Sequence, residues 1–233
     1  MVVVSLSRML NCLPKYSLPR QDCQLPPRSY ASPLRTAQAA ETRRRILDAA
    51  AVLVATDGYA STSLSRIAEA AGVSLETVKA NGPKSALLLG AFDQAFTGSE
   101  GVGAIHERDL GAQILAVPDD RLLAHYVAFI AGANERISRL WIALLDASMG
   151  DPALEAGLEA LQARRRSDFR ASMVAFRERG LARREGDDIL FADALSFLVS
   201  PSSYVQLVLD AGWTSEQYCD WLVDTIERTI FAP

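Results

Sequence analysis

The side chains best suited to recognising another molecule gather in one short segment, residues 74 to 84. The segment combines small residues, which allow close approach to base edges, with amide and ammonium groups that donate hydrogen bonds. Its candidate contact residues are Ser74, Leu75, Glu76, Thr77, Lys79, Ala80, Asn81 and Lys84. This set favours binding to double-stranded DNA, and the sequence leaves open which member reads a base.

The chain offers no arrangement typical of an enzyme. Its two histidines, His106 and His125, are far apart in sequence and have no cysteine or carboxylate pattern typical of zinc. Nucleophile-elbow, P-loop and dinucleotide-binding motifs are absent from the sequence. The run Arg164 to Arg166 is interpreted as a solvated helix face. We therefore expect a protein that is not an enzyme, with no catalytic residue, no metal-binding residue and no cofactor.

Composition favours a globular protein of the cytoplasm. With 233 residues, 49% of them hydrophobic, the chain can bury a sizeable core. No apolar run reaches the roughly 18 residues of a membrane span. The three cysteines, Cys12, Cys23 and Cys219, lack metal-ligand spacing, and their odd number suits a reducing compartment.

Charge is distributed unevenly along the chain. Residues 1–97 hold 11 Lys+Arg against 7 Asp+Glu, and the remainder holds 13 against 21. Much of the basic excess lies in residues 1–35, where helical patterns are interrupted by Pro14, Pro19, Pro26, Pro27 and Pro33. We expect a disordered basic arm there, either an unstructured leader or a segment that contacts DNA.

Helices dominate from Thr36 onward, and the first apolar stripe ends near Gly58. Ser63 and Ser74 are candidate N-caps of two short helices, and Gly72 between them can adopt a left-handed conformation. Helical spacing in the first of the pair is kept by Leu64, Ile67, Ala68 and Ala71. So tight a connection forces the two helices to cross steeply, as in a helix-turn-helix.

Lys84 follows Pro83, a residue suited to the first turn of a fourth helix. We expect its side chain to face outward beside free backbone N–H groups and to bind a DNA phosphate. Thr62, Ser63 and Ser74, at the starts of the two short helices, are expected to assist it. A solvated surface lysine and simple helix capping are the alternatives.

Residues 42–92 read TRRRILDAAAVLVATDGYASTSLSRIAEAAGVSLETVKANGPKSALLLGAF. This segment resembles the DNA-binding domain of the TetR family of bacterial transcriptional regulators. The resemblance implies an all-α fold, in which an N-terminal helix-turn-helix domain, residues 36–97, precedes a larger helical ligand-binding and dimerisation domain, residues 98–233. The candidate DNA-binding residues are then Arg44, Thr62, Ser63, Ser74, Leu75, Glu76, Thr77, Lys79, Ala80, Asn81 and Lys84.

The segment departs from the family pattern at two places. Lys79 stands where the family commonly has a tyrosine that touches the DNA backbone. The phenylalanine that usually follows is either deleted between Asn81 and Gly82 or replaced by Gly82. The ungapped alignment would place Ser85 at the family's lysine, and we prefer the gapped one, which keeps Lys84 there.

The remainder is expected to be helical at 119–134, at 136–148 and in a long helix after Asp151-Pro152. Aromatic and methionine side chains here are ordinary core residues or, as the resemblance implies, line a mostly apolar cavity for a small apolar or aromatic ligand. The candidate ligand-binding residues are Tyr126, Phe129, Trp141, Met149, Phe169, Met173, Phe176 and Phe197.

The C-terminal segment resembles the helix pair that forms a two-fold bundle between two copies of such regulators, with a kink expected at Pro201. The candidate dimer residues are Leu198, Val205, Leu209, Tyr218, Trp221, Leu222, Thr225, Ile226 and Thr229. We therefore expect a homodimeric repressor that binds a palindromic DNA operator and is released by a ligand. The alternative is a helical ligand-binding or scaffold protein with weak or lost DNA binding.

Overall fold

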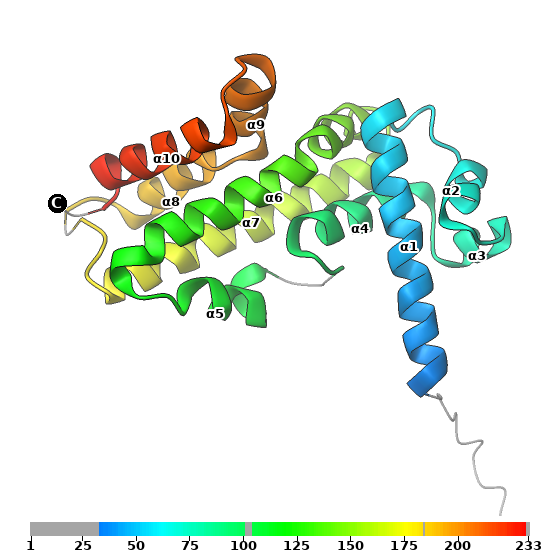
Figure 1. Cartoon of the computed structure of the whole chain (residues 1–233), viewed down its shortest axis with the longest axis horizontal. Coiled ribbons are helices and arrows are strands. Elements are labelled where there is room, and N and C mark those ends of the chain that lie inside the picture. Colours follow the sequence, from blue (N-terminus) through cyan, green and yellow to red (C-terminus); the bar gives the residue numbers. More distant parts are fainter. Residues whose placement is uncertain (1–32, 101–103, 184, 232–233) are drawn as a thin grey trace, which may run out of the picture.

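The computed structural model describes residues 33–100, 104–183 and 185–231, and over these ranges the expected all-α fold is confirmed (Figure 1). The β pairing recorded in the described part is a single isolated bridge between Ala182 and Phe231. The expected arm lies largely outside these ranges. Its end does not, because the first helix already begins at Pro33 and not at Thr36.

The helix-turn-helix occupies the first part of the chain. Its helices are α1 (Pro33–Asp57), α2 (Leu64–Ala71), α3 (Leu75–Ala80) and α4 (Lys84–Thr97). The three predicted residues at the helix ends are confirmed: the Ser63 and Ser74 hydroxyls cap the N-termini of α2 and α3, and Gly72, which ends α2, has φ 64°. Gly72 allows the chain to reverse between the two helices, because a left-handed backbone is strained for residues with a Cβ atom.

The second part of the chain is built on two long helices. Its elements are η1 (Ile105–Glu107), α5 (Asp109–Leu115), α6 (Asp119–Ser148), α7 (Pro152–Glu178), α8 (Asp188–Leu198), α9 (Pro201–Tyr204), η2 (Val205–Asp210) and α10 (Ser215–Thr229). The expected break near residue 135 is wrong, since α6 is continuous. Asp151 caps α7 as expected, and the break at Pro201 separates α8 from α9.

Two apolar clusters hold the described chain together. One is formed by the four helices α1 through α4 together with the second half of α6 and the start of α7, and it includes Val78, Leu88 and Leu140. The other joins α5, the first half of α6, the end of α7 and the helices that follow, and includes Phe176 and Leu222. The helices α6 and α7 therefore serve both cores. Figure 1 shows α2 and α3 at one end of them and α8 and α10 at the other.

Candidate functional sites

The helix α3 is held by caps at both ends and by one buried anchor. The Ser74 hydroxyl accepts a hydrogen bond from the Thr77 N–H at 3.1 Å, and the Asn81 side-chain amide donates to the Thr77 carbonyl at 2.8 Å. Val78 is fully buried. Six residues are too few for a stable isolated helix, so these contacts determine its position.

The outer face of α3 differs in part from the prediction. Glu76, Lys79 and Ala80 are exposed, and Thr77 is half-buried. Leu75 is half-buried against the core, and the Asn81 amide is engaged in capping. The expectation that Leu75 and Asn81 point outward is therefore wrong, because each satisfies a local packing or capping requirement.

Two arginines of α1 that the sequence analysis missed hold the helix-turn-helix. Arg43 donates to the Asn81 carbonyl at 2.7 Å and pairs with Glu100, while Arg45 donates to the Ala71 carbonyl. Arg44, the predicted DNA contact, pairs on the surface with Glu41 at 2.7 Å and Asp48 at 2.8 Å. The arginine run at 43–45 was the available signal, but it does not reveal which side chain faces which neighbour.

Lys84 does not face outward. Its ammonium donates to the carbonyls of Tyr59 at 2.8 Å and Thr62 at 3.0 Å and lies 3.9 Å from the centre of the Tyr59 ring. The expectation of an outward side chain is wrong, because Lys84 begins α4, where the helix dipole disfavours a cation and the loop carbonyls offer acceptors. Tyr59 in turn donates its hydroxyl to Asp151 at 3.0 Å. Burial first and this hydrogen bond second raise the pKa of Tyr59 to about 12.

Two residues before α2, Thr62 and Ser63, were predicted to contact phosphate, and their surroundings differ. Thr62 is 1% exposed and donates its hydroxyl to the Gly58 carbonyl at 2.9 Å, so its side chain cannot reach DNA. Ser63 is exposed and accepts from the Arg66 N–H at 3.2 Å. Its capping role is confirmed, and its DNA contact stays a prediction.

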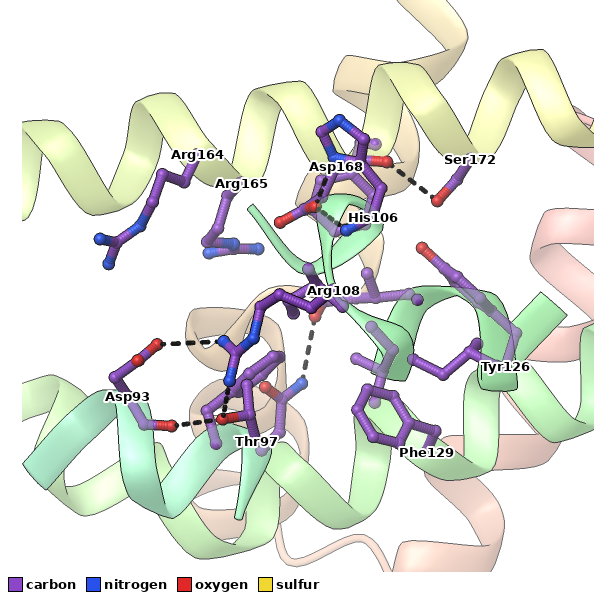
Figure 2. A pocket seen from close by; sticks show the side chains of 18 of the residues that line it. Asp93, Thr97, His106, Arg108, Tyr126, Phe129, Arg164, Arg165, Asp168 and Ser172 are labelled. Carbon is purple, nitrogen blue, oxygen red and sulfur yellow. Dashed lines mark hydrogen bonds and ion pairs between the residues drawn. The ribbon is translucent and has the colours of Figure 1, made fainter. Parts of the chain in front are cut away.

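A cavity lies between α4, η1, α5, α6 and α7 (Figure 2). With its open mouth it encloses about 960 Å³. Its walls are mostly apolar. The predicted residues that line it are Tyr126, Phe129 and Phe169. Burial raises the pKa of the Tyr126 hydroxyl, so this group stays protonated at neutral pH.

The other predicted ligand residues do not line this cavity. Trp141, Met173 and Phe176 are buried in the core, where the Trp141 indole donates to Ser202 at 3.0 Å. Met149 is 82% exposed and Phe197 is 71% exposed. Helical spacing identified apolar positions, but it does not distinguish a cavity wall from a filled core or from an exposed apolar face.

Charged side chains line the cavity among the apolar ones, and Figure 2 shows them facing the same space. Asp168 accepts from the backbone N–H of His106 at 2.8 Å, and its Oδ1 lies 2.8 Å from the His106 Nδ1. Arg108 donates to the Thr97 hydroxyl at 3.2 Å, and its Nη1 lies 3.9 Å from Asp93. These groups give a mostly apolar cavity distinct polar positions.

The interpretation of residues 164–166 as a solvated face is wrong for two of the three. Arg164 and Arg165 line the cavity, while Arg166 is exposed. Arg165 donates to the Ser196 carbonyl at 3.3 Å and lies 5.6 Å from the Phe169 ring centre. Burial is the main cause that lowers the pKa of its guanidinium.

The predicted dimer stripe on α10 faces inward over much of its length. Tyr218, Leu222 and Ile226 are fully buried in the chain's own core, so their assignment to a contact with a second copy is wrong. The other predicted positions are at least partly accessible: Leu198, Val205, Leu209, Trp221, Thr225 and Thr229. A more exposed apolar row lies on α8 at Leu190, which the sequence analysis did not single out, and Phe197, which it assigned to the ligand cavity.

Comparisons with known proteins agree with this architecture. Residues 46–78 match a family model described as bacterial regulatory proteins, tetR family. Among curated proteins, none matches the chain. None of the helices described here is long and apolar enough to span a membrane.

Solved structures with the same fold cover most of the chain. A protein assigned as a transcriptional regulator from Saccharomonospora viridis, in complex with choline, is 23% identical, covers 83% of this chain and 99% of its own, and has a TM-score of 0.63. A protein assigned to the TetR family from Rhodococcus sp. is 21% identical, with coverages of 82% and 98% and a TM-score of 0.65.

NalD, the secondary repressor of the MexAB-OprM multidrug efflux pump in Pseudomonas aeruginosa, is 18% identical, covers 84% of this chain and 98% of its own, and has a TM-score of 0.57. The resemblance to the TetR family is therefore confirmed: residues 46–78 carry the sequence module of that family, and the chain has the fold of its transcriptional regulators.

Proposed function

We propose that this protein is a homodimeric transcriptional repressor that binds a palindromic DNA operator and leaves it when a small molecule fills the cavity. The observation that carries the proposal is a firmly capped α3 with an exposed outer face, in a chain whose α4 both follows α3 and lines a cavity. In this proposal residues 36–97 form the DNA-binding domain and residues 98–233 the ligand-binding and dimerisation domain. The protein acts in the cytoplasm and not as an enzyme.

The proposed DNA-binding face is the outer side of α3 with its N-cap. In this proposal Glu76, Thr77 and Ala80 meet base edges, while Lys79, with Ser74 at the start of the helix, binds phosphates. The Lys79 side chain is exposed, and its ammonium forms no hydrogen bond or ion pair with another described residue. Its charge therefore remains available and replaces the tyrosine that the family commonly has there.

The helix α4 gives the ligand a route to the DNA-binding face. Phe92, Phe96 and Thr97 of α4 line the cavity, and Lys84 at the start of the same helix holds the loop between α1 and α2. A ligand that prefers one position of α4 shifts the population toward the corresponding arrangement of the helix-turn-helix. Release follows when the two recognition helices of a dimer no longer match the spacing of about 34–36 Å between half-sites.

The relatives support this reading by analogy. NalD is a repressor, and the Saccharomonospora viridis protein was solved with a small molecule bound. A single helix-turn-helix makes few base contacts, so two copies on a symmetric site are the expected way to gain specificity.

The proposal is tested by fluorescence anisotropy of the purified chain with DNA from upstream of its own gene, against scrambled DNA, over a range of salt concentrations. We expect preferential binding that weakens with salt. Lys79→Met should weaken binding to both DNAs and reduce the salt slope by about one unit. The control is Arg166→Gln, which also removes one positive charge, but at an exposed position on α7. It should leave the affinity and the salt slope unchanged.

The alternative of a ligand-binding scaffold predicts a different result. A scaffold would bind neither DNA even at low salt, and this outcome would overturn the regulator. If the chain binds DNA without preference for its own upstream region, a selection of bound sequences from a random DNA pool locates the operator. Failure of that selection to enrich any palindrome also contradicts the proposal.

A further inference from the structure

The cavity contains carboxylates, but both are already paired. Asp168 is held by the backbone N–H and the imidazole of His106, each at 2.8 Å. Asp93 lies 3.9 Å from a guanidinium nitrogen of Arg108. Asp93 is therefore shared with Arg108, and Asp168 is hydrogen-bonded to His106, while the charge of Asp168 also acts on Arg165 without a direct ion pair.

The two arginines of α7 lack such partners. Arg165 donates to one backbone carbonyl, that of Ser196, and forms no ion pair with a described carboxylate. Arg164 also forms no ion pair with the described residues. Figure 2 shows both side chains extending from α7 into the space that Asp93 and Arg108 border from the opposite side. A partly buried guanidinium without a direct ion-pair partner is stabilised by an anion that reaches it.

The apolar walls continue directly from these arginines. The Phe169 ring centre lies 5.6 Å from the Arg165 guanidinium, and Phe96 and Phe129, both in the cavity wall, meet edge to face with ring centres 6.3 Å apart. Ile130 and Leu161 complete this region. A space with two arginines that form no ion pair on one wall, and with mostly apolar side chains elsewhere beside the paired Asp93 and Asp168, matches a molecule that is charged at one end only.

We propose that the ligand of this cavity is an amphipathic carboxylate, whose anionic end is bound by Arg165 and Arg164 and whose aromatic or aliphatic body lies among Phe96, Phe129 and Phe169. This inference deepens the proposed function and rests on it for the regulatory consequence. A guanidinium binds a carboxylate through two parallel hydrogen bonds, which fix its orientation. A quaternary ammonium such as choline, seen in a relative, meets two like charges here and is disfavoured.

The test uses three probes with one apolar body and different charges: naphthoate, naphthalenemethanol and trimethyl(naphthylmethyl)ammonium. Isothermal titration calorimetry on the full chain measures their affinities. We expect the carboxylate to bind about tenfold or more tightly than the alcohol, in line with charge-assisted hydrogen bonds, and the ammonium to bind most weakly. Equal or tighter binding of the alcohol or the ammonium, or no carboxylate binding at millimolar concentration, overturns the proposal.

Two variants locate the charge effect. In Arg165→Gln the affinity of the carboxylate should fall toward that of the alcohol, with Arg164 as its remaining partner, while the affinity of the alcohol changes little. Arg166→Gln, the exposed neighbour on α7 that does not line the cavity, should leave all three affinities unchanged. If both variants weaken the carboxylate equally, long-range charge explains the preference and the assigned contact is wrong. The probe series on the unaltered chain does not depend on how a variant folds.

The ligand class and the regulatory function fail separately. If the probes show no preference for the carboxylate while operator binding is intact and depends on salt, the proposed ligand class is wrong and the proposed regulator stands. If the chain binds the carboxylate preferentially but binds no DNA, the proposed regulator is wrong and the proposed ligand class stands. When both hold, naphthoate should release the operator in the anisotropy assay and the alcohol should do so only at higher concentration.

Discussion

Lys84 and Lys79 lie close in sequence, but their surroundings predict opposite effects of the same substitution. The Lys84 ammonium satisfies two loop carbonyls, at 2.8 and 3.0 Å, so Lys84→Met should lower the free energy of unfolding by about 1–3 kcal/mol. Lys79 is exposed, and its ammonium donates to none of the described carbonyls. Lys79→Met should therefore change the free energy of unfolding by about 0.5 kcal/mol or less. Urea unfolding measures both. Equal effects would show that the Lys84 contacts contribute no stability.

Tyr59 predicts a dependence of stability on alkaline pH. Its pKa is raised from 10.0 to about 12, so between these values the unfolded chain loses this proton before the folded chain does. Stability from Tyr59 is complete below pH 10 and declines as pH rises toward 12. Urea unfolding of the native chain and Tyr59→Phe should therefore show an advantage of the native chain that shrinks over this window. Tyr126 and Tyr218 also have raised pKa values. The native chain and the Tyr59→Phe variant both retain these two tyrosines, so their contributions cancel in the difference. A constant difference would contradict the prediction.

At single residues the sequence predicted chemical type better than direction. The hydroxyls of Ser63 and Ser74 were assigned correctly because an N-cap is a local feature of neighbouring residues. Lys84, Thr62 and Arg165 were expected to face solvent or DNA and instead satisfy or border groups from distant parts of the chain. Their direction depends on which loops and helices pack beside them, and a single sequence does not give that.

Among the helices, caps and apolar periodicity predicted α2, α3 and α7 well, whereas α6 was divided in two. The division fell near Asn134, a polar residue that breaks the apolar pattern. In the structure Asn134 is fully buried and donates to the Val199 carbonyl at 3.1 Å, at the end of α8. The short helix α5 was missed because seven residues carry too little periodicity to identify it.

Arg43 connects the end of α3 to the segment after α4, and this connection predicts a local effect on α3. Removing the carboxylate in Glu100→Gln frees Arg43, whose other hydrogen bond holds the Asn81 carbonyl. Because the pair is partly exposed, its loss is worth about 1 kcal/mol or less, so hydrogen exchange at residues 78–82 should quicken by at most roughly fivefold.

Mass spectrometry of amide exchange checks this effect, and DNA affinity should fall in parallel while naphthoate affinity stays unchanged. Glu159→Gln, which neutralises an exposed carboxylate on α7, is the control for charge alone. Equal exchange in both variants would show that the Arg43 connection does not hold α3.

On the scale of the molecule, the sequence predicted a helix-turn-helix followed by a larger helical part, but not how the two parts share their helices. Two of the α6 residues that pack against α1 to α4 are Leu140 and Leu144, from the half of the chain predicted to bind ligand. Their apolar spacing indicates burial without naming the partner. A ligand that moves α6 or α7 would therefore change the packing of both apolar clusters, as the proposed coupling between ligand binding and DNA release requires.

The exposed face of α8 carries the last prediction, which concerns assembly. Leu190 and Phe197 are 66% and 71% exposed and share one face of α8, at the end of the molecule far from α3 (Figure 1). Exposed large apolar side chains in one row mark a surface that gains stability by being covered. If the proposed dimer forms through this face, Phe197→Asp should give a monomer in sedimentation experiments and weaken specific DNA binding by at least about tenfold, since one copy reads only half of a palindrome. Met149→Asp, at an apolar position 82% exposed and outside α8, should leave assembly and DNA binding unchanged. A Phe197→Asp protein that remains dimeric would place the contact elsewhere, and a native chain that is already monomeric would refute the homodimer.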